Sequence, residues 1–171
     1  MPVKNPKELF VLMLSDLRQG SERTGKILEE INGVAQDPDV KEALEARLFV
    51  SQNIRNTLDQ VFKLIGEQPV KLSGRLYEVF AEDFRRELAE IQSPAVRHLF
   101  ILAKVSHLIH LRIAEYKVLI AAADLTGHHG VGVLLESALA SNLALVERTH
   151  RLIRAIAEAK VAERIAAKPA A

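Results

Sequence analysis

The spacing of apolar residues constrains the fold of this chain more than any other feature. In four long segments, apolar side chains recur at steps of three and four residues, which is the period of an α-helix with one buried face, and no segment alternates with period two. The residues of these stripes are Phe10, Leu14, Leu17, Leu28 and Ile31; Leu44, Leu48, Leu58, Phe62 and Ile65; Leu99, Leu102, Ile109, Ile113, Tyr116 and Ile120; and Leu135, Leu139, Val146, Ile153 and Ile156. The spacing therefore predicts an all-α protein.

The starts of three helices are marked by the same local signal. Asn5-Pro6, Asp37-Pro38 and Ser93-Pro94 each place a capping side chain directly before a proline. Proline is favoured at the first helical position because its fixed φ suits the helix and its missing N–H has no partner there anyway. We expect a helix to begin at each of these prolines.

Glycines mark the ends of two helices, and the chain between them predicts one more. Gly66 and Gly127 are placed to end long helices, and Ser73 is placed to cap a shorter helix over about residues 74–91. Short turns between long helices favour antiparallel neighbours. The sequence predicts an antiparallel four-helix bundle with an additional shorter connecting helix.

The length of the chain fits one domain. With 171 residues, 49% of them hydrophobic, the chain can bury one core and is too short for two comfortable ones. We expect a single domain over residues 1–171 with its core at about residues 6–160. The Ala-rich tail, residues 161–171, is expected to fray.

Charge and composition exclude several classes of function. The formal net charge is only +1, so no strong field favours nucleic acid or an anionic membrane. There is no cysteine, which excludes disulfides and thiolate chemistry, and the N-terminus lacks the apolar core of a signal peptide. Lys104, His107, His110 and Arg112 interrupt the most apolar segment. We expect a soluble, cytoplasmic protein that binds neither nucleic acid nor membrane.

Three stretches carry a family resemblance. They are LFVLMLSDLRQGSERTGKILEEI, LEARLFVSQNIRNTLDQVF and LIHLRIAEYKVLIAAADLTGHHGVGVLLESAL. Together they resemble the YciF-like family of bacterial ferritin-like proteins, over roughly residues 7–160. The resemblance implies a ferritin-like fold similar to that of rubrerythrin, a homodimer, and a link to bacterial stress responses without an established activity.

The resemblance also locates the place where a ferritin-like dimetal centre is expected. Such a centre needs carboxylates and histidines from four helices, because two neighbouring cations must be neutralised and bridged. The corresponding positions here are Ser21; Phe49 or Val50; Gln52; Ile109 and Arg112; and Ala140, Ser141, Asn142 and Val146. None of these residues is acidic, although His110 is kept. The resemblance therefore implies a ferritin-like bundle that has lost its metal ligands.

We expect four of these positions to form a polar waist in the middle of the bundle: Ser21, Gln52, Arg112 and Asn142. This would explain why the stretch FVSQNIRN, residues 49–56, is polar in the middle of an amphipathic helix. Buried polar groups cost about 1–3 kcal/mol each when they lack partners, so mutual hydrogen bonds or a trapped water are expected.

Arg112 admits two interpretations. In one, its guanidinium supplies the positive charge that a metal would otherwise bring and pairs with a nearby carboxylate of Asp16, Glu22 or Glu115. In the other, Arg112 lies on the flank of its helix and extends to solvent. The sequence leaves both open.

Two glycines in the first predicted helix also need an explanation. Gly20 and Gly25 each cost up to about 1 kcal/mol relative to alanine in a helix interior. The close approach of another helix or of a second subunit would offset this cost. A ligand cavity is the alternative.

A weaker alternative is a non-standard mononuclear metal site. Glu147 and His150 lie three residues apart on one helix face, and His107 and His110 share another. Iron, zinc or manganese are the metals considered for this set, although a solvated helix face for Glu147 and His150, and packing beside small residues for His107 and His110, are the commoner explanations. No catalytic residue and no organic cofactor site is predicted.

Three functional hypotheses follow. The first is a metal-free, non-enzymatic bundle that acts by interaction. The second is a residual metalloprotein or oxidoreductase, and the third is a carrier of a small apolar ligand in the vacated waist.

Overall fold

The described part of the protein consists of five α-helices. The computed structural model describes the backbone of residues 3–166 and the side chains of residues 3–159. In chain order the helices are α1 (Pro6–Val34), α2 (Pro38–Ile65), α3 (Arg75–Glu90), α4 (Pro94–Leu125) and α5 (His129–Ala166), and the described part contains no strand. The all-α prediction is confirmed.

The caps explain where these helices begin and end. Asn5 accepts a hydrogen bond from the Glu8 N–H, and Asp37 accepts two, from the N–H groups of Asp39 and Val40. Gly66 ends α2 in the left-handed conformation, with φ of 68°.

Two caps differ from the sequence interpretation. Ser93 precedes α4 as expected, but its side chain makes no capping hydrogen bond. The residue before α3 is Gly74, with φ of 60°, and not Ser73. A chain that enters a helix in the left-handed region favours glycine, which has no Cβ to strain.

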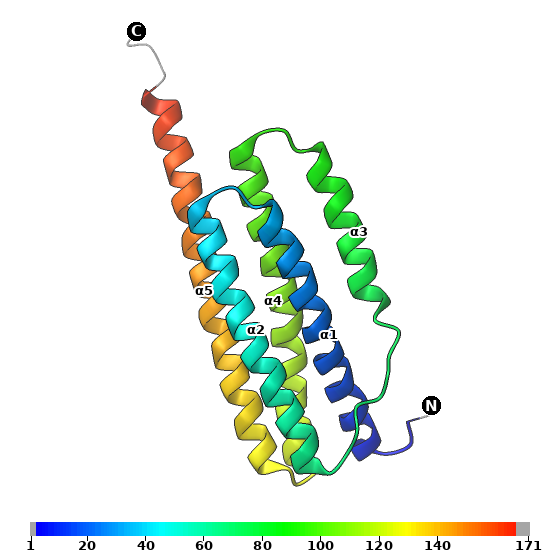
Figure 1. Cartoon of the computed structure of the whole chain (residues 1–171). Coiled ribbons are helices and arrows are strands. Elements are labelled where there is room, and N and C mark those ends of the chain that lie inside the picture. The colour runs from blue at the N-terminus through cyan, green and yellow to red at the C-terminus, as the bar shows by residue number, and fades with distance from the viewer. Residues whose placement is uncertain (1–2, 167–171) are drawn as a thin grey trace.

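Four helices surround a common core. α1 packs against α2 and α4, and α5 packs against α4 and α2, with neighbours antiparallel (Figure 1). The chain from Gly66 to Ser93, which includes α3, returns from one end of the bundle to the other, so α4 runs parallel to α2. This is the antiparallel ferritin-like bundle with a shorter connecting helix that the sequence predicts.

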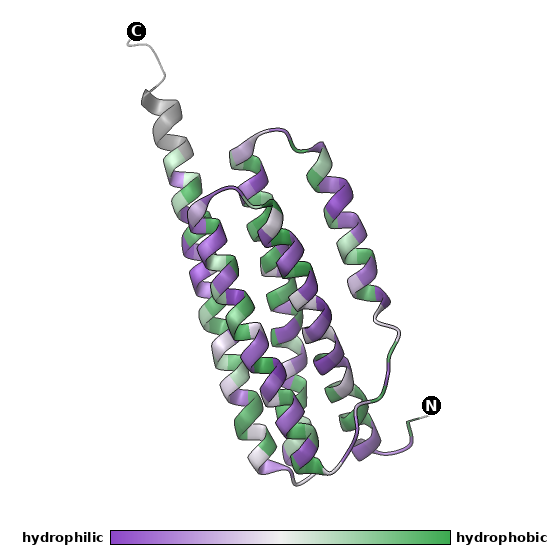
Figure 2. Cartoon of the chain, viewed as in Figure 1, coloured by the Kyte–Doolittle hydropathy of each residue, from purple (hydrophilic) through white to green (hydrophobic). Residues whose placement is uncertain are grey.

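α3 lies outside the four-helix core, against α1 and α4 (Figure 1). It buries Tyr77, Ala81, Phe84 and Leu88, and the Phe84 ring stacks on Phe100 of α4 with centroids 5.8 Å apart. Both hydrophobic and hydrophilic residues occur along α3 and the other helices, as expected for helices with one buried face (Figure 2).

The last helix is longer than expected. α5 continues to Ala166, and its end extends past its neighbours (Figure 1). The predicted frayed tail is therefore helical in its first part, consistent with the high helix propensity of alanine. Residues 167–171 lie outside the described residues.

One segment of α5 resembles a membrane span by composition. Among the described residues, His129–Ala159 alone is long and apolar enough to cross a membrane. No membrane span was predicted from the sequence, because charged and histidine residues interrupt the apolar stretch of the α4 region. Core helices of globular proteins have the same composition, and α5 packs along α4 and α2.

The core is divided into two apolar clusters. One contains Phe10, Leu14, Leu17, Ile54, Leu58, Tyr116, Leu119 and Leu135, and the other contains Leu28, Ile31, Val40, Leu44, Phe84, Ile101, Ile109 and Leu145, among others. On each of the four long helices, at least one buried polar residue lies near the boundary between the two clusters.

Candidate functional site

Six buried polar residues form a layer between the two apolar clusters. We call this set the polar waist layer: Ser21 and Thr24 of α1, Arg47 and Ser51 of α2, Arg112 of α4, and Asn142 of α5. None of them is more than 8% exposed. With Ile54 and Tyr116 they line a cavity of about 10 Å³, close to the minimum of roughly 10–15 Å³ that holds one water molecule.

Arg112 lies inside the bundle. Its side chain is 2% exposed, and its Nη1 donates to the Leu17 carbonyl at 3.2 Å and to Glu115 Oε2 at 2.5 Å. The guanidinium also lies 4.7 Å from the centre of the Tyr77 ring, within the range of a cation–π contact. The interpretation that Arg112 extends to solvent is wrong, and of the three carboxylates considered as partners Glu115 is the one bonded.

Gly20 makes room for this guanidinium. A Cβ built on Gly20 would overlap the terminal atoms of Arg112, which reach α1 from α4. The expected close approach at Gly20 is therefore made by a side chain of another helix. At Gly25 a built Cβ would meet only Ser51 Oγ, at 4.0 Å.

Arg47 is the residue that the sequence analysis missed. It is 3% exposed, and its Nη1 donates to Asn142 Oδ1 at 2.9 Å, while Asn142 Nδ2 donates to the Ala138 carbonyl. The signal was present, because Arg47 and Ser51 continue the three- and four-residue steps between Leu44 and Ile54. In the predicted apolar stripe of this helix, no residue is assigned between Leu48 and Leu58, and Arg47 and Ser51 are the polar residues that continue it.

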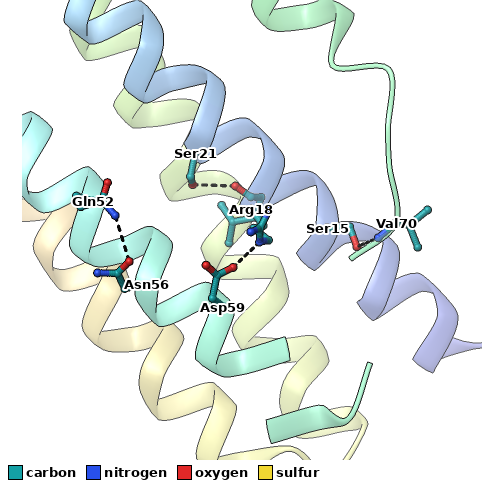
Figure 3. Close-up of polar contacts among 8 residues, drawn as sticks. Ser15, Arg18, Ser21, Gln52, Asn56, Asp59 and Val70 are labelled. Atoms are coloured by element: carbon teal, nitrogen blue, oxygen red, sulfur yellow. Dashed lines mark hydrogen bonds and ion pairs between the residues drawn. The ribbon is translucent and has the colours of Figure 1, made fainter. Parts of the chain in front are cut away.

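Gln52, by contrast, does not belong to the waist. It is exposed and bonds along its own helix to Asn56, at 3.1 Å (Figure 3). It also accepts a hydrogen bond from Arg55. In the stretch FVSQNIRN, Phe49 is 69% exposed, and of the polar residues only Ser51 is buried. Most of that stretch is polar because it forms the outer face of α2.

Ser21, the waist residue predicted on α1, does lie in the polar waist layer. Ser21 is 6% exposed, and its hydroxyl donates to the Leu17 carbonyl at 2.8 Å (Figure 3). That carbonyl thus accepts from both Ser21 and Arg112. Ser21, Arg112 and Asn142 are brought together at the cavity, and Gln52 is not.

Burial shifts the pKa values of the ionisable groups in this region. Burial raises the pKa of the Glu115 carboxyl to about 7, although the Arg112 charge opposes the shift. Burial lowers the pKa of Arg47 to about 10 and lowers that of Arg112, and it raises the pKa of the Tyr116 phenol. At neutral pH both guanidinium groups carry their charge and Tyr116 keeps its proton.

Several donors at the cavity are left without a partner. Among buried side-chain atoms of the described residues, Arg47 Nε, Arg112 Nε and Nη2, Thr24 Oγ1 and the Tyr116 hydroxyl make no hydrogen bond. All four residues line the cavity. Buried groups of this kind normally have partners, so a cluster of them marks the waist as unusual.

The lining does not suit a dimetal centre. It contains no carboxylate and no histidine, and it contains two guanidinium groups that repel cations. Of the other aligned positions, Ile109 is 1% exposed in an apolar cluster, Val146 packs against that cluster, and Ala140 is exposed. The donor set needed to neutralise two cations is not assembled here.

The alternative metal ligands are only partly brought together. The rings of His110 on α4 and His150 on α5 stack with centroids 6.0 Å apart, and His110 Nδ1 lies 2.9 Å from the Ser106 carbonyl. His107 and Glu147 are exposed. Within the described ranges, no group of three histidine or acidic side chains is placed to hold a metal ion.

Comparisons with known proteins agree with this architecture. The family model described as Domain of unknown function (DUF892) matches residues 5–166. No curated protein sequence matches the chain.

Three solved structures have the same fold. The E. coli stress protein YciF is 20% identical with a TM-score of 0.85, over 91% of this chain and 99% of that one. YcfI of Rhodopseudomonas palustris, described as a proposed structural protein, is 24% identical with a TM-score of 0.82, over 86% and 94%. A protein from Xanthomonas campestris pv. campestris is 16% identical with a TM-score of 0.72, over 93% and 97%.

At these identities the structural matches show the fold alone, whereas the family model spans almost the whole described chain. The protein belongs to the DUF892 family, and the resemblance to YciF-like proteins is confirmed.

Proposed function

We propose that this protein is a metal-free, non-enzymatic ferritin-like bundle that acts as a structural or interaction protein. The observation that carries the proposal is the polar waist layer, in which Arg47 and Arg112 lie at the level where a ferritin-like protein would hold its cations. Two buried positive charges replace the need for metal charge and oppose metal binding.

The absence of an assembled reactive group among the waist residues supports the non-enzymatic part of the proposal. General acid–base chemistry needs titratable groups in a cleft that admits substrate. The waist cavity holds about 10 Å³, and Glu115, whose pKa of about 7 would suit such chemistry, is bonded to Arg112 and does not line that cavity.

The biological setting is proposed from relatives. The structure of similar fold from E. coli is described as that of a stress protein, and the Rhodopseudomonas structure as that of a proposed structural protein. We place this chain in the same kind of stress-related, cytoplasmic role, as a homodimer. Light scattering of the purified full chain at several concentrations tests the dimer, which requires twice the monomer mass.

Elemental analysis tests the metal-free proposal directly. Untagged protein would be purified from cells supplied with iron, zinc and manganese, together with a Glu147→Ala, His150→Ala double variant. We expect metal well below one equivalent in both proteins. One or more equivalents that survive gel filtration in the wild type would contradict the proposal.

A mononuclear metal site is the second candidate, because one observation favours it. His110 and His150 face each other across α4 and α5 with ring centroids 6.0 Å apart. If this pair holds iron, zinc or manganese, the metal will be lost in the double variant and in His110→Ala. If metal is retained in those variants, it lies elsewhere.

The apolar-ligand carrier is not supported. The waist cavity has room for about one water molecule, and its lining is charged and polar. Drug-sized apolar ligands occupy pockets of roughly 300–1,000 Å³. An apolar compound would therefore have to displace the two arginines.

A further inference from the structure

The waist cavity is surrounded by hydrogen-bond donors in excess of acceptors. Arg47, Arg112, Thr24 and Tyr116 all line this region, and each has at least one buried polar atom that bonds to no other described residue. None of the four side chains is more than 3% exposed. Guanidinium nitrogens can only donate, and the two hydroxyl groups can donate, so the cavity is suited to a guest that accepts.

The charge in this layer is also unbalanced. Arg47 bonds to the neutral amide of Asn142, while Arg112 bonds to the carboxylate of Glu115, and the carboxylate of Asp16, on the exposed side of α1, acts on Arg112 from a distance. Arg47 therefore has no bonded carboxylate among the described residues. An uncompensated buried charge is strongly destabilising, so something that carries negative charge is favoured beside Arg47.

The size of the cavity limits which anions can bind there. About 10 Å³ accommodates one small guest, and chloride, which is somewhat larger than a water molecule, fits when the lining side chains move slightly outward. Phosphate, sulfate and organic acids are too large. A water molecule fits, but it accepts only two hydrogen bonds and leaves the charge of Arg47 uncompensated.

We propose that the cavity between Arg47 and Arg112 binds one small monovalent inorganic anion of the size of chloride. The anion accepts hydrogen bonds from the two guanidinium groups, Thr24 and Tyr116 and neutralises the waist. The polar waist layer would thus bind an anion, whereas a metal centre binds cations. This inference concerns what stabilises the fold and does not depend on the proposed interaction role.

Thermal unfolding in matched salts tests the proposal. The full chain would be melted in sodium chloride and in sodium gluconate at equal ionic strength, since gluconate is too large for the cavity. At a chloride concentration a hundredfold above its dissociation constant, the melting temperature should rise by about 5–10 °C for a chain of this length. No difference between the two salts would overturn the proposal.

Three variants separate the waist from other anion sites. Arg47→Met should abolish the chloride-dependent shift, because a buried charge replaced by an apolar side chain of similar length is usually tolerated by the fold. Tyr116→Phe removes one donor and keeps the ring, so it should reduce the shift even if Arg47→Met fails to fold. Arg148→Met is the matched control, because Arg148 is a half-exposed arginine that pairs with Glu42, and it should keep the full shift.

Anomalous scattering from crystals grown in sodium bromide provides the direct readout. A single bromide in contact with both Arg47 and Arg112 is the expected result. A cavity that holds only water, or a chloride shift that is equal in Arg47→Met and in the wild type, would show that the proposal is wrong.

Discussion

At the scale of single residues, a glycine and an arginine on neighbouring helices depend on each other. Gly20 would normally weaken α1, yet its missing side chain is the space that Arg112 occupies. Arg112 in turn donates a hydrogen bond to the Leu17 carbonyl of α1, which also accepts a hydrogen bond from the Ser21 hydroxyl. The cost of a glycine in a helix is offset by a contact that only glycine permits.

Gly20→Ala should therefore destabilise the protein, although alanine is the better helix former. The added Cβ displaces the buried guanidinium of Arg112, and overpacking of this kind costs about 1–3 kcal/mol in the free energy of unfolding. Gly33→Ala is the matched control on the same helix, because a Cβ there meets nothing within 4 Å. It should leave stability unchanged or raise it by up to about 1 kcal/mol.

Urea unfolding of the two variants measures this difference. A double variant, Gly20→Ala with Arg112→Met, should recover part of the loss because the overlapping group is gone. Equal effects at Gly20 and Gly33 would contradict the packing described here.

The Glu115 carboxyl predicts how stability changes with pH. Its pKa is about 7 in the folded protein and 4.5 by reference for the unfolded chain. Between these values the folded state binds more protons than the unfolded state, so the free energy of unfolding falls as pH rises. The loss should be on the order of 1–3 kcal/mol by pH 8, given 1.36 kcal/mol per pKa unit and a partly exposed group.

Glu115→Gln should flatten this part of the pH profile, measured by urea unfolding from pH 4.5 to pH 8. Glu136→Gln is the control, because Glu136 is exposed on α5, and it should keep the wild-type slope. If the wild type and Glu115→Gln show the same slope, burial of Glu115 is not the cause.

At the scale of helices, the caps differ in how much they stabilise. Asp37 accepts two backbone N–H bonds at the start of α2, whereas Ser93 accepts none at the start of α4. Both residues precede a proline, so the sequence signal is the same. The difference lies in side-chain orientation, which the sequence does not specify.

We expect Asp37→Ala to cost about 0.5–2 kcal/mol and Ser93→Ala to cost much less. Asp37 Oδ2 also lies 3.8 Å from His98 Nδ1, so both variants should be compared in a His98→Gln background, which isolates the cap. Chemical denaturation of both variants measures the two losses in the free energy of unfolding. A loss at Ser93 as large as that at Asp37 would show that Ser93 does cap its helix in solution.

The same contrast shows what the sequence can and cannot predict. The number of helices and the helix starts marked by proline follow from local chemistry and from the period of the apolar residues. Both predictions are confirmed for the described residues. The rotational position of a residue is harder to predict, because neighbouring residues on a helix are about 100° apart. An error of one position moved the expected waist residue from Ser51 to Gln52, from the core to solvent.

Arg47 was missed for a different reason. A charged residue on an apolar stripe is usually solvated, and its burial depends on groups from other helices, here Asn142 on α5. Local sequence contains no information on such a partner. The polar waist layer is thus a tertiary feature, which the sequence indicates only through the gap it leaves in the apolar stripe.

At the scale of the whole molecule, the described chain behaves as four mutually packed helices and one attached helix. α1, α2, α4 and α5 each bury residues in both apolar clusters or in the layer between them. α3 contacts α1 and α4, far more sparsely than the long helices contact one another, and it buries four side chains. The connection before α3 is held by Gln19, which bonds to both the N–H and the carbonyl of Leu72, and by Ser15, which accepts from Val70 (Figure 3).

We therefore predict that α3 opens without global unfolding. Regions with few buried contacts exchange their amide hydrogens through local opening, at a lower free energy than the core. Native-state hydrogen exchange should show lower protection in α3 than in α2 or α4. Phe84→Ala removes a buried ring that stacks on Phe100 and should lower protection further in α3, while Val79→Ala, at a residue 44% exposed on the same helix, should not. If α3 exchanges only together with the four long helices, it is an integral part of the core, and the bundle is stabilised by five helices.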